Sequence, residues 1–401
     1  MGETGAGRRA LRVLMLCENA PSTDPAGGDG STMITAHFLR DLPAGLEVDL
    51  VYFADGRTSP DAAAVQRASS VHELPTRSRR RALLAQPFTR LPRASWQRPV
   101  RRRRLRAWAR HADVLYVHGL HVMHHALRLP LPVVVHEVDP WSEYWAQRAA
   151  GRRGARRWYD LLQSRRAARL ERAVAAAGGT LVVVNERDAE SLRRSTGGRV
   201  YAVSNGVDRS VPADVTVPAA PVAAFVGTLD YPPNVEAVTR LASQVWPLVR
   251  SEVPDARLLV AGRHATADVR ALARDGQDGV DVLGEVDDVS AVFGQARVSV
   301  YAGTTGRGTK NSVTESLVAG CPVVASEESA RGQVRGPHLL VGEDPAALAA
   351  LVVSQLRDDE ANRGARRSCA QVRTQVKGWE ETARELADLL HAAAASDRGT
   401  A

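Results

Sequence analysis

The chain has 401 residues, which is too long for one ordinary domain and predicts two domains of roughly 150–200 residues each. With 44% hydrophobic and 24% charged residues, its composition is typical of a globular protein. No run approaches the roughly 18 apolar residues of a membrane span, and the N-terminus lacks the apolar segment of a signal peptide. Cys17, Cys321 and Cys369 have no metal-ligand spacing and indicate no disulfide framework, so we expect small buried thiols in a reducing cytoplasm.

The charge is unevenly distributed along the chain. Residues 1–210 contain 34 Lys and Arg against 20 Asp and Glu, whereas the remaining residues contain 19 against 25. Most of the basic excess lies in residues 77–110, which contain no acidic residue. This segment fits a solvated helix pair covering a sheet, an interfacial helix on an anionic membrane surface, or a nucleic-acid patch. We place the membrane surface ahead of nucleic acid, and expect a cytoplasmic protein that can bind peripherally to the inner membrane face.

The first half alternates short apolar runs with helical segments. A helix is expected at about 33–41. The runs predicted as strands are 11–18, 46–53, 113–119, 132–138, 180–185 and 199–207. Short apolar strands that alternate with helices indicate a parallel sheet covered on both faces.

The second half repeats this pattern after a probable linker at 209–221, which is rich in Pro and Ala and has no periodicity. The strands expected there are 222–228, 256–262, 280–284, 297–303, 321–326 and 338–342, and a helix is expected at 378–395. The predicted domains are therefore 1–208 and 222–377, joined by 209–221, with a C-terminal helical segment, 378–401, that can cross back to the first domain. The fold class is α/β, with two doubly wound, Rossmann-like domains that face a central cleft.

Polar residues gather where the predicted strands end, which is where ligands bind in such sheets. They are Gly28–Gly30, His118, His136–Asp139, Asn205–Asp208, Arg263 and Lys310–Glu315. The sequence HGLHVMHH (118–125) invites a metal interpretation, but no matching Asp or Cys cluster supports it, and an ordinary helix face is favoured.

The stretch GRGTKNSVTESLVAGCPVVAS (306–326) carries the clearest chemistry. A helix that begins near Asn311 or Ser312, both good N-cap residues, would present amides and a dipole to an anion. Lys310 adds a charge suited to phosphate, and Glu315 is suited to a ribose diol. A nucleotide would satisfy both groups. Alternatively, Glu315 is only an acid favoured near a helix N-terminus by the dipole.

Several segments resemble the GT-B-fold retaining glycosyltransferases of glycosyltransferase family 4 (group 1), and within them the bacterial exopolysaccharide-type sugar transferases. The similarity lies in HEVDPWSEYWAQRA (136–149), ERAVAAAGGTLVVVNERDAESL (171–192), SNGVD (204–208), FVGTLDYPPNVEAV (225–238), LLVAGR (258–263), VLGEVDDV (282–289) and residues 306–326. It covers nearly the whole chain. It implies a hexosyltransferase that moves a sugar from a nucleotide-diphosphate donor to a hydroxyl, with retention of configuration.

The resemblance also implies a set of donor-binding residues. Glu315 matches the second glutamate of the paired-glutamate motif, which holds the ribose, whereas the first glutamate falls at Arg307 and is absent. The diphosphate-binding arginine and lysine are missing from the loop after Gly227, so Arg263 and Lys310 are expected to replace them. The donor-binding residues expected are Gly28, Gly30, Gly227, Arg263, Val286, Thr309, Lys310, Asn311 and Glu315. Arg263 can alternatively be a surface charge, and the glycine loop around Gly28 a flexible turn.

The catalytic residues that the resemblance suggests are His136, near the donor sugar, and Asp139 beside it. Arg263, Lys310 and helix amides would stabilise the departing diphosphate, so we expect no metal and no cofactor besides the nucleotide sugar. The acceptor can be a glycan, a lipid-linked glycan or a small molecule. Two rival hypotheses remain. One is a catalytically degenerate glycosyltransferase acting as a carbohydrate-binding or partner subunit, which the departures at Thr228, Arg307 and Ser312 motivate. The other is a nucleotide-sugar 2-epimerase.

Overall fold

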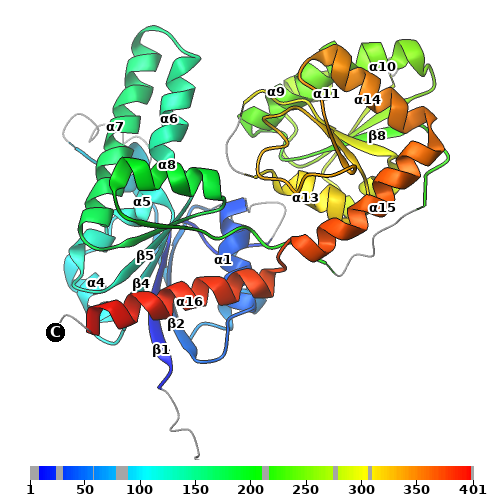
Figure 1. Ribbon diagram of the computed structural model, residues 1–401. Coiled ribbons are helices and arrows are strands. Elements are labelled where there is room, and N and C mark those ends of the chain that lie inside the picture. Colours follow the sequence, from blue (N-terminus) through cyan, green and yellow to red (C-terminus); the bar gives the residue numbers. More distant parts are fainter. Residues whose placement is uncertain are drawn as a thin grey trace, which may run out of the picture. The chain divides into compact units, whose positions relative to one another are not determined.

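The computed structural model in Figure 1 describes residues 9–23, 30–56, 58–77, 89–209, 216–273, 279–305 and 309–398. Contacts divide the chain into two compact units. The first comprises Met1–Asn205 together with Trp379–Ala401, and the second comprises Gly206–Gly378. None of the described helices is long and apolar enough to cross a membrane.

The first unit is built on a parallel sheet of seven strands in the order β3-β2-β1-β4-β5-β6-β7. The strands are β1 (Leu11–Cys17), β2 (Leu46–Ala54), β3 (Ser70–Pro75), β4 (Val114–His118), β5 (Val133–Val138), β6 (Thr180–Val183) and β7 (Arg199–Ala202). Every strand that the sequence predicts here is present, and β3 is an additional edge strand. Alternate residues of β1 enter opposite cores, with Val13 and Met15 on one face and Leu14 and Leu16 on the other.

Helices cover both faces of this sheet. They are α1 (Gly30–Arg40), α2 (Ala62–Val65), α4 (Arg102–Ala109), α5 (Leu120–Met123), α6 (Trp141–Ala150), α7 (Gly154–Ala176), α8 (Glu186–Thr196) and α16 (Trp379–Arg398). Phe38 of α1 and Leu390 of α16 lie in one core, whereas Leu105 of α4 and Leu192 of α8 lie in the other. Helices α6 and α7 form an antiparallel pair that projects beyond the sheet (Figure 1).

The C-terminal helix α16 packs on the first unit although the second unit precedes it in sequence. Its Trp379 ring stacks on His37 of α1 at 4.2 Å between ring centroids, and its Thr382 hydroxyl donates to the carbonyl of Ser204 at 3.1 Å. Leu386 and Leu390 are buried in the core of the first unit. The helix therefore closes one face of the N-terminal sheet.

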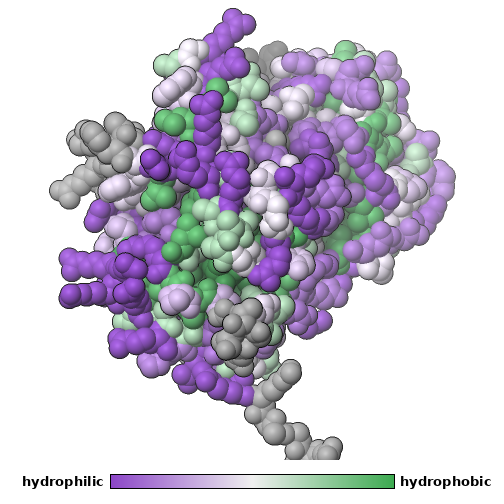
Figure 2. Space-filling model, turned by 60° about the vertical axis from the view of Figure 1, so that its left-hand side comes forward, coloured by the Kyte–Doolittle hydropathy of each residue, from purple (hydrophilic) through white to green (hydrophobic). Residues whose placement is uncertain are grey.

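The basic segment has an arginine-rich helix, α4, at its C-terminal end, and residues 78–88 of that segment lie outside the described residues. Arg101–Arg104 are exposed, whereas Leu105 is fully buried. Trp108 stacks on His72 of β3 at 4.8 Å. The apolar side of α4 is therefore packed on the protein and its arginines face outward. Figure 2 shows that hydrophilic side chains project from much of this side of the molecule.

The second unit is a parallel sheet of six strands in the order β10-β9-β8-β11-β12-β13. The strands are β8 (Val222–Val226), β9 (Arg257–Ala261), β10 (Val280–Gly284), β11 (Val298–Tyr301), β12 (Val323–Ala325) and β13 (Leu339–Val341). The helices are α9 (Pro232–Arg240), α10 (Trp246–Glu252), α11 (Ala267–Ala271), α12 (Val289–Gln295), α13 (Asn311–Val318), α14 (Pro345–Arg357) and α15 (Asp359–Gln375). All six strands that the sequence predicts are present.

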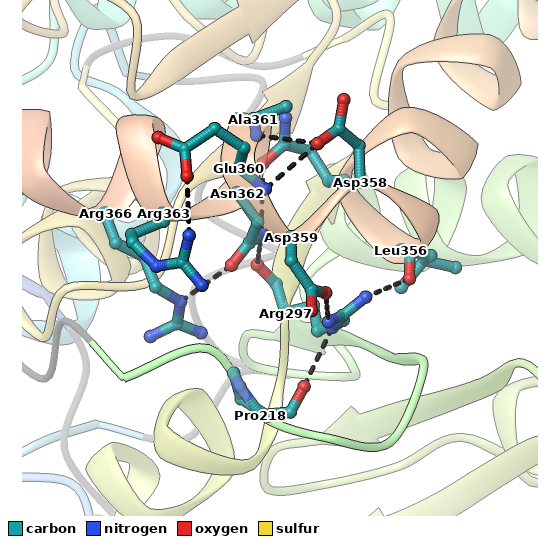
Figure 3. A network of polar contacts seen from close by, with 11 residues as sticks. Pro218, Arg297, Leu356, Asp358, Asp359, Glu360, Ala361, Asn362, Arg363 and Arg366 are labelled. Carbon is teal, nitrogen blue, oxygen red and sulfur yellow. Dashed lines mark hydrogen bonds and ion pairs between the residues drawn. The ribbon is translucent and has the colours of Figure 1, made fainter.

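Two arginines fix α15 and the entry to β8 against the sheet (Figure 3). Arg297, which precedes β11, donates to the carbonyl of Pro218 at 2.8 Å and forms an ion pair with Asp359. Asn362 donates to the carbonyl of Arg297 at 2.7 Å and accepts from the fully buried Arg366 at 3.0 Å. This network holds the second unit together from inside, away from the carboxyl ends of the strands.

Candidate functional site

The stretch 306–326, which includes helix α13, follows β11 in the second unit. Gly306, Arg307 and Gly308 lie outside the described residues. Helix α13 begins at Asn311, as predicted, but the N-cap residue is Lys310, not Asn311 or Ser312, and it makes no side-chain capping bond. The N-terminal amides of α13 therefore have no side-chain cap from Lys310. The positive end of the helix dipole lies at the same place and also attracts an anion. This is the arrangement that binds phosphate.

Lys310 and Glu315 are both partly buried, and burial pushes each toward its neutral form. Burial lowers the pKa of Lys310, with Glu328 and Glu236 acting in the opposite direction. Burial raises the pKa of Glu315. Among the described residues, no ion pair involves the Lys310 ammonium and no hydrogen bond reaches the Glu315 carboxylate. Because such groups are costly to bury unpaired, a ligand that supplies an anion and hydroxyl donors would be favoured here.

Neighbouring side chains hold α13 in place. The Tyr301 hydroxyl donates to the carbonyl of Ser312 at 3.1 Å, and the Gln333 amide donates to the carbonyl of Lys310 at 2.9 Å. Thr314 donates to the same Gln333 side chain at 2.9 Å. The helix start is thus fixed by contacts that leave the Lys310 ammonium and the Glu315 carboxylate unused.

The ends of β8 and β9 approach each other closely. Gly262 has a φ of 150°, and a Cβ there would lie 1.8 Å from the carbonyl oxygen of Gly227. Only glycine fits this position. Arg263 follows and accepts a hydrogen bond from the amide of Leu229 through its carbonyl at 2.8 Å. His264, next to it, has a φ of 57°, an unusual value for a residue with a side chain.

The remaining residues of the second unit that the sequence predicts as donor-binding lie at the same edge. Val286 follows β10 and packs partly buried against a core cluster. Thr309 lies against Gly332, where a Cβ would come within 2.4 Å of the threonine hydroxyl. Because the strand order is β10-β9-β8-β11 and all four are parallel, Gly227, Arg263, Val286 and the segment from Thr309 belong to one sheet edge.

Sequence reasoning missed Glu236, which holds the loop after β11. Its carboxylate accepts from the Thr304 amide and the Thr304 hydroxyl, both at 3.0 Å. Its neighbour Arg240 donates to the carbonyl of Ala302 at 2.6 Å. Glu236 lies on α9, between β8 and β9, and only the fold brings it to this loop.

The first unit places two histidines at adjacent strand ends. His118 ends β4, and His136 lies on β5 directly beside it. The Tyr116 hydroxyl lies 3.1 Å from Nδ1 of His118 and 3.0 Å from Nδ1 of His136. Nε2 of His118 lies 2.8 Å from the Ser31 hydroxyl, which stands beside Gly30 at the start of α1. Gly28 lies outside the described residues.

These histidines are buried and neutral at pH 7. Burial lowers the pKa of His118 to about 4, and burial together with His118 lowers the pKa of His136 well below its ordinary value. Nε2 of His136 is buried and has no hydrogen-bond partner in the described part of the chain. It is therefore a buried nitrogen at the strand end whose hydrogen-bonding capacity the described residues leave unused.

The backbone after His136 is strained. Val138 has a φ of 69°, which is an outlier for a β-branched residue, and the β5–β6 register shifts between His136 and Val138. Glu137 turns inward, where burial and the carboxylate of Glu171 raise its pKa well above the ordinary range. Asp139 is only partly buried. Strain of this kind concentrates at functional sites. Here the strained residue, Val138, lies between the buried Glu137 and the predicted catalytic residue Asp139.

A third group at this edge was not foreseen. Glu18 follows β1 and bonds both the amide and the ring of His121, which follows β4. The two residues are 103 positions apart, so no local pattern signals their contact. Within the described residues, no group of three or more His, Cys, Asp or Glu side chains could hold a metal ion.

Several solved structures share this architecture. The chain is similar to Alr3699/HepE from Anabaena in complex with UDP, with 14% identity over 95% of this chain and all of that one and a TM-score of 0.67. It is also similar to sucrose-phosphate synthase from Thermosynechococcus elongatus, with 15% identity, 96% and 100% coverage and a TM-score of 0.70. At these identities the likeness concerns the fold. Two Rossmann-like units of parallel strands define the GT-B class.

Family models match both units. The model described as "Glycosyl transferases group 1" matches residues 220–358, and the model described as "Glycosyltransferase Family 4" matches residues 29–211. No curated protein matched this chain in sequence. On the two model matches, which together span most of its length, the chain belongs to the group 1 glycosyltransferases.

Proposed function

We propose that this chain transfers a sugar from a nucleotide-diphosphate donor to a hydroxyl acceptor with retention of configuration and without a metal. The observation that carries the proposal is the start of α13, where amides without a side-chain cap, the Lys310 ammonium and the Glu315 carboxylate lie within six residues. Phosphate suits the first two groups, and a ribose diol suits the third. Groups that suit the phosphate and the ribose of a nucleotide are therefore both present at the start of α13.

In this proposal, positively charged side chains and helix amides stabilise the departing diphosphate in place of a metal. Lys310 and the α13 amides would stabilise the charge that develops on the leaving oxygens, and Arg263, which follows β9 at the same end of the sheet, would assist. In the first unit, the buried Nε2 of His136 would orient a sugar hydroxyl, with Asp139 beside it. The Anabaena protein was solved with UDP-glucose, so UDP-glucose is the first donor to test.

The acceptor class and the membrane contact belong to the same proposal. A glycan, a lipid-linked glycan or a small molecule would each supply the hydroxyl. The exposed Arg101–Arg104 would contact an anionic inner membrane surface by charge alone, because Leu105 and Trp108 of α4 are packed on the protein. A cytoplasmic location with peripheral binding would follow.

A degenerate, non-catalytic protein is the second candidate. The position at which the family's first glutamate is expected carries Arg307, and the loop after Gly227 carries no cation up to Asn234. Such a protein would retain nucleotide or carbohydrate binding and would release no nucleoside diphosphate.

One assay separates these candidates. The purified chain is incubated with UDP-glucose, with EDTA or with magnesium, and UDP release is followed over time. The anomeric configuration of the sugar product is then read by proton NMR. Release in EDTA with an α-configured product supports the proposal. A β-configured product contradicts retention, dependence on magnesium contradicts metal independence, and binding without release supports the degenerate candidate.

A further inference from the structure

The exposed face of helix α7 carries arginines and no acidic residue. Its exposed residues with long side chains are Arg156, Arg157, Trp158, Arg165, Arg169 and Arg172. Spacings of seven, four and three residues place Trp158, Arg165, Arg169 and Arg172 on one side of the helix. Among the residues that the structure describes, no ion pair involves any of these arginines. This side of α7 is therefore positively charged along its length.

Both acidic residues of α7 point into the protein. Asp160 is fully buried, and its carboxylate forms ion pairs with Arg148 at 3.5 Å and with Arg152 at 3.2 Å. Glu171 is also buried, and its carboxylate accepts a hydrogen bond from the amide of Ser142 at 2.9 Å. Because these carboxylates are used in contacts with α6 and the turn after it, they do not neutralise the exposed arginines.

Trp158 is 67% exposed, more than any other large apolar side chain among the described residues. Its neighbour Tyr159 lies instead against Trp145, with 6.2 Å between ring centroids. Leu161 and Leu162, about one turn further along, are partly exposed. The interface between water and lipid suits an indole, because it accommodates the apolar rings and the N–H together. Leucines beside the ring favour lipid over nucleic acid, whose phosphates and base edges offer them little.

The position of this face makes it accessible. Helices α6 and α7 form a pair that projects beyond the sheet of the first unit (Figure 1). The Arg148 guanidinium lies over the Trp145 ring at 4.9 Å, so contacts within the pair shape its tip without a partner. Helix α4 differs, because its Leu105 and Trp108 are packed on the protein and only its charge faces outward. The pair therefore offers the apolar contact that α4 lacks.

We propose that the exposed face of α7 binds an anionic membrane surface, with its arginines on lipid phosphates and Trp158 inserted at the level of the headgroups. This inference rests on the membrane contact in the proposed function and names the surface that makes it. Arginine binds phosphate through two parallel N–H donors, which suits a layer of phosphodiesters. From the helical rise per residue, the face from Trp158 to Arg172 is about 21 Å long, so it spans several headgroups.

Co-sedimentation of the full-length protein with vesicles tests the proposal. Vesicles of phosphatidylcholine and phosphatidylglycerol in equal amounts should bind it, and vesicles of phosphatidylcholine alone should not. We expect Trp158→Ala to weaken binding to the mixed vesicles by about tenfold, because the apolar contact of the ring is lost. Arg165→Glu combined with Arg169→Glu should weaken it by about 30-fold or more, because two charges near the surface are lost and reversed.

Two variants are matched controls for these changes. Leu248→Ala removes an exposed apolar side chain from α10. Arg363→Glu combined with Arg367→Glu makes the same change of charge at the same spacing, on exposed positions of α15. Both variants should bind the mixed vesicles as the wild-type protein does.

Fluorescence quenching locates Trp158 directly. The chain has seven tryptophans, and brominated lipids quench only those that lie in the bilayer. We expect quenching in mixed vesicles with the wild-type protein, and its loss in Trp158→Phe, which keeps an apolar ring for binding. Quenching that persists unchanged in Trp158→Phe contradicts the insertion of Trp158.

The remaining outcomes separate this surface from its rivals. Wild-type affinity of the α7 variants for the mixed vesicles overturns the inference. If Arg102→Glu combined with Arg103→Glu in α4 then abolishes binding, the membrane contact of the proposed function stands without α7. Wild-type protein that binds neither kind of vesicle refutes both, whereas sugar transfer is decided separately by UDP release. Tighter binding to a duplex oligonucleotide than to the mixed vesicles, lost in the same α7 variants, overturns the inference in favour of nucleic acid.

Discussion

Lys310 and Glu315 are the residues on which the proposed donor site depends. Burial favours the uncharged form of each, and among the described residues no ion pair involves the Lys310 ammonium and no hydrogen bond reaches the Glu315 carboxylate. A bound nucleotide would supply a phosphate to the first and ribose hydroxyls to the second, so binding would stabilise both charged forms. In this proposal, the two side chains would bind different parts of the same nucleotide, its phosphate and its ribose.

Replacing Glu315 tests its half of this site. Glu315→Ala should weaken UDP binding by about 1–3 kcal/mol, because a charged hydrogen-bond acceptor for the ribose is lost. Isothermal titration calorimetry measures the change. Asp255→Ala is the control, since Asp255 is exposed and precedes β9, at the opposite edge of the same sheet. Equal UDP affinity in the two folded variants would contradict a ribose-binding role for Glu315.

Tyr116 links the two buried histidines of the first unit. Tyr116→Phe removes the hydroxyl that contacts Nδ1 of His118 and Nδ1 of His136. Both buried nitrogens then lose this hydrogen-bond partner. We expect the free energy of unfolding to fall by about 1–2 kcal/mol, measured by urea denaturation. Tyr201→Phe, at an exposed side chain of β7, should have no measurable effect. An unchanged midpoint for Tyr116→Phe would show that the bridge carries no stability.

At the scale of elements, the strands were predictable and some of their partners were not. Buried parallel strands are continuous apolar runs, so the core strands are evident in the sequence. The edge strand β3, Ser70–Pro75, was missed because it alternates exposed and partly buried residues and contains His72 and Glu73. Position at strand ends identified His136 and Lys310, because topology alone places them there. Glu18 and Glu236 escaped detection because their partners, His121 and Thr304, are brought to them only by tertiary structure.

Helix α15 depends on a buried arginine. Arg366 donates to Asn362 at 3.0 Å and to the carbonyl of Gly320 at 3.3 Å (Figure 3 shows the contact with Asn362). Arg366→Leu should lower the free energy of unfolding of the second unit by about 3 kcal/mol, because it leaves these acceptors buried and unpaired. Arg367→Leu, which removes only an exposed ion pair with Glu360, should change it by less than about 0.5 kcal/mol. Similar shifts for the two variants in thermal denaturation would refute this structural role.

At the scale of the whole molecule, the buried histidines make stability depend on pH. Burial lowers the pKa of His118 and His125 to about 4 and that of His124 to about 3, from an ordinary value of 6.5. The unfolded chain therefore binds protons first as pH falls below 6.5, and stability is lost. Glu137 and Glu171, whose pKa values burial raises, act in the opposite direction and offset part of this loss.

The first unit should accordingly be less stable at pH 5 than at pH 7, by about 2 kcal/mol. Urea denaturation of the full chain at the two pH values measures the difference. A first unit of equal or greater stability at pH 5 would mean that the histidines are not held neutral in the folded state.

In the proposed function, the second unit holds a nucleotide through α13 without a metal. Calorimetric titration of the full chain with UDP, GDP, TDP and ADP, each in EDTA and in magnesium, tests it most directly. We expect selective binding of one nucleoside diphosphate with the same Kd in both buffers. Binding only in magnesium would contradict the metal-independent site, and no binding of any of the four would contradict the nucleotide site itself.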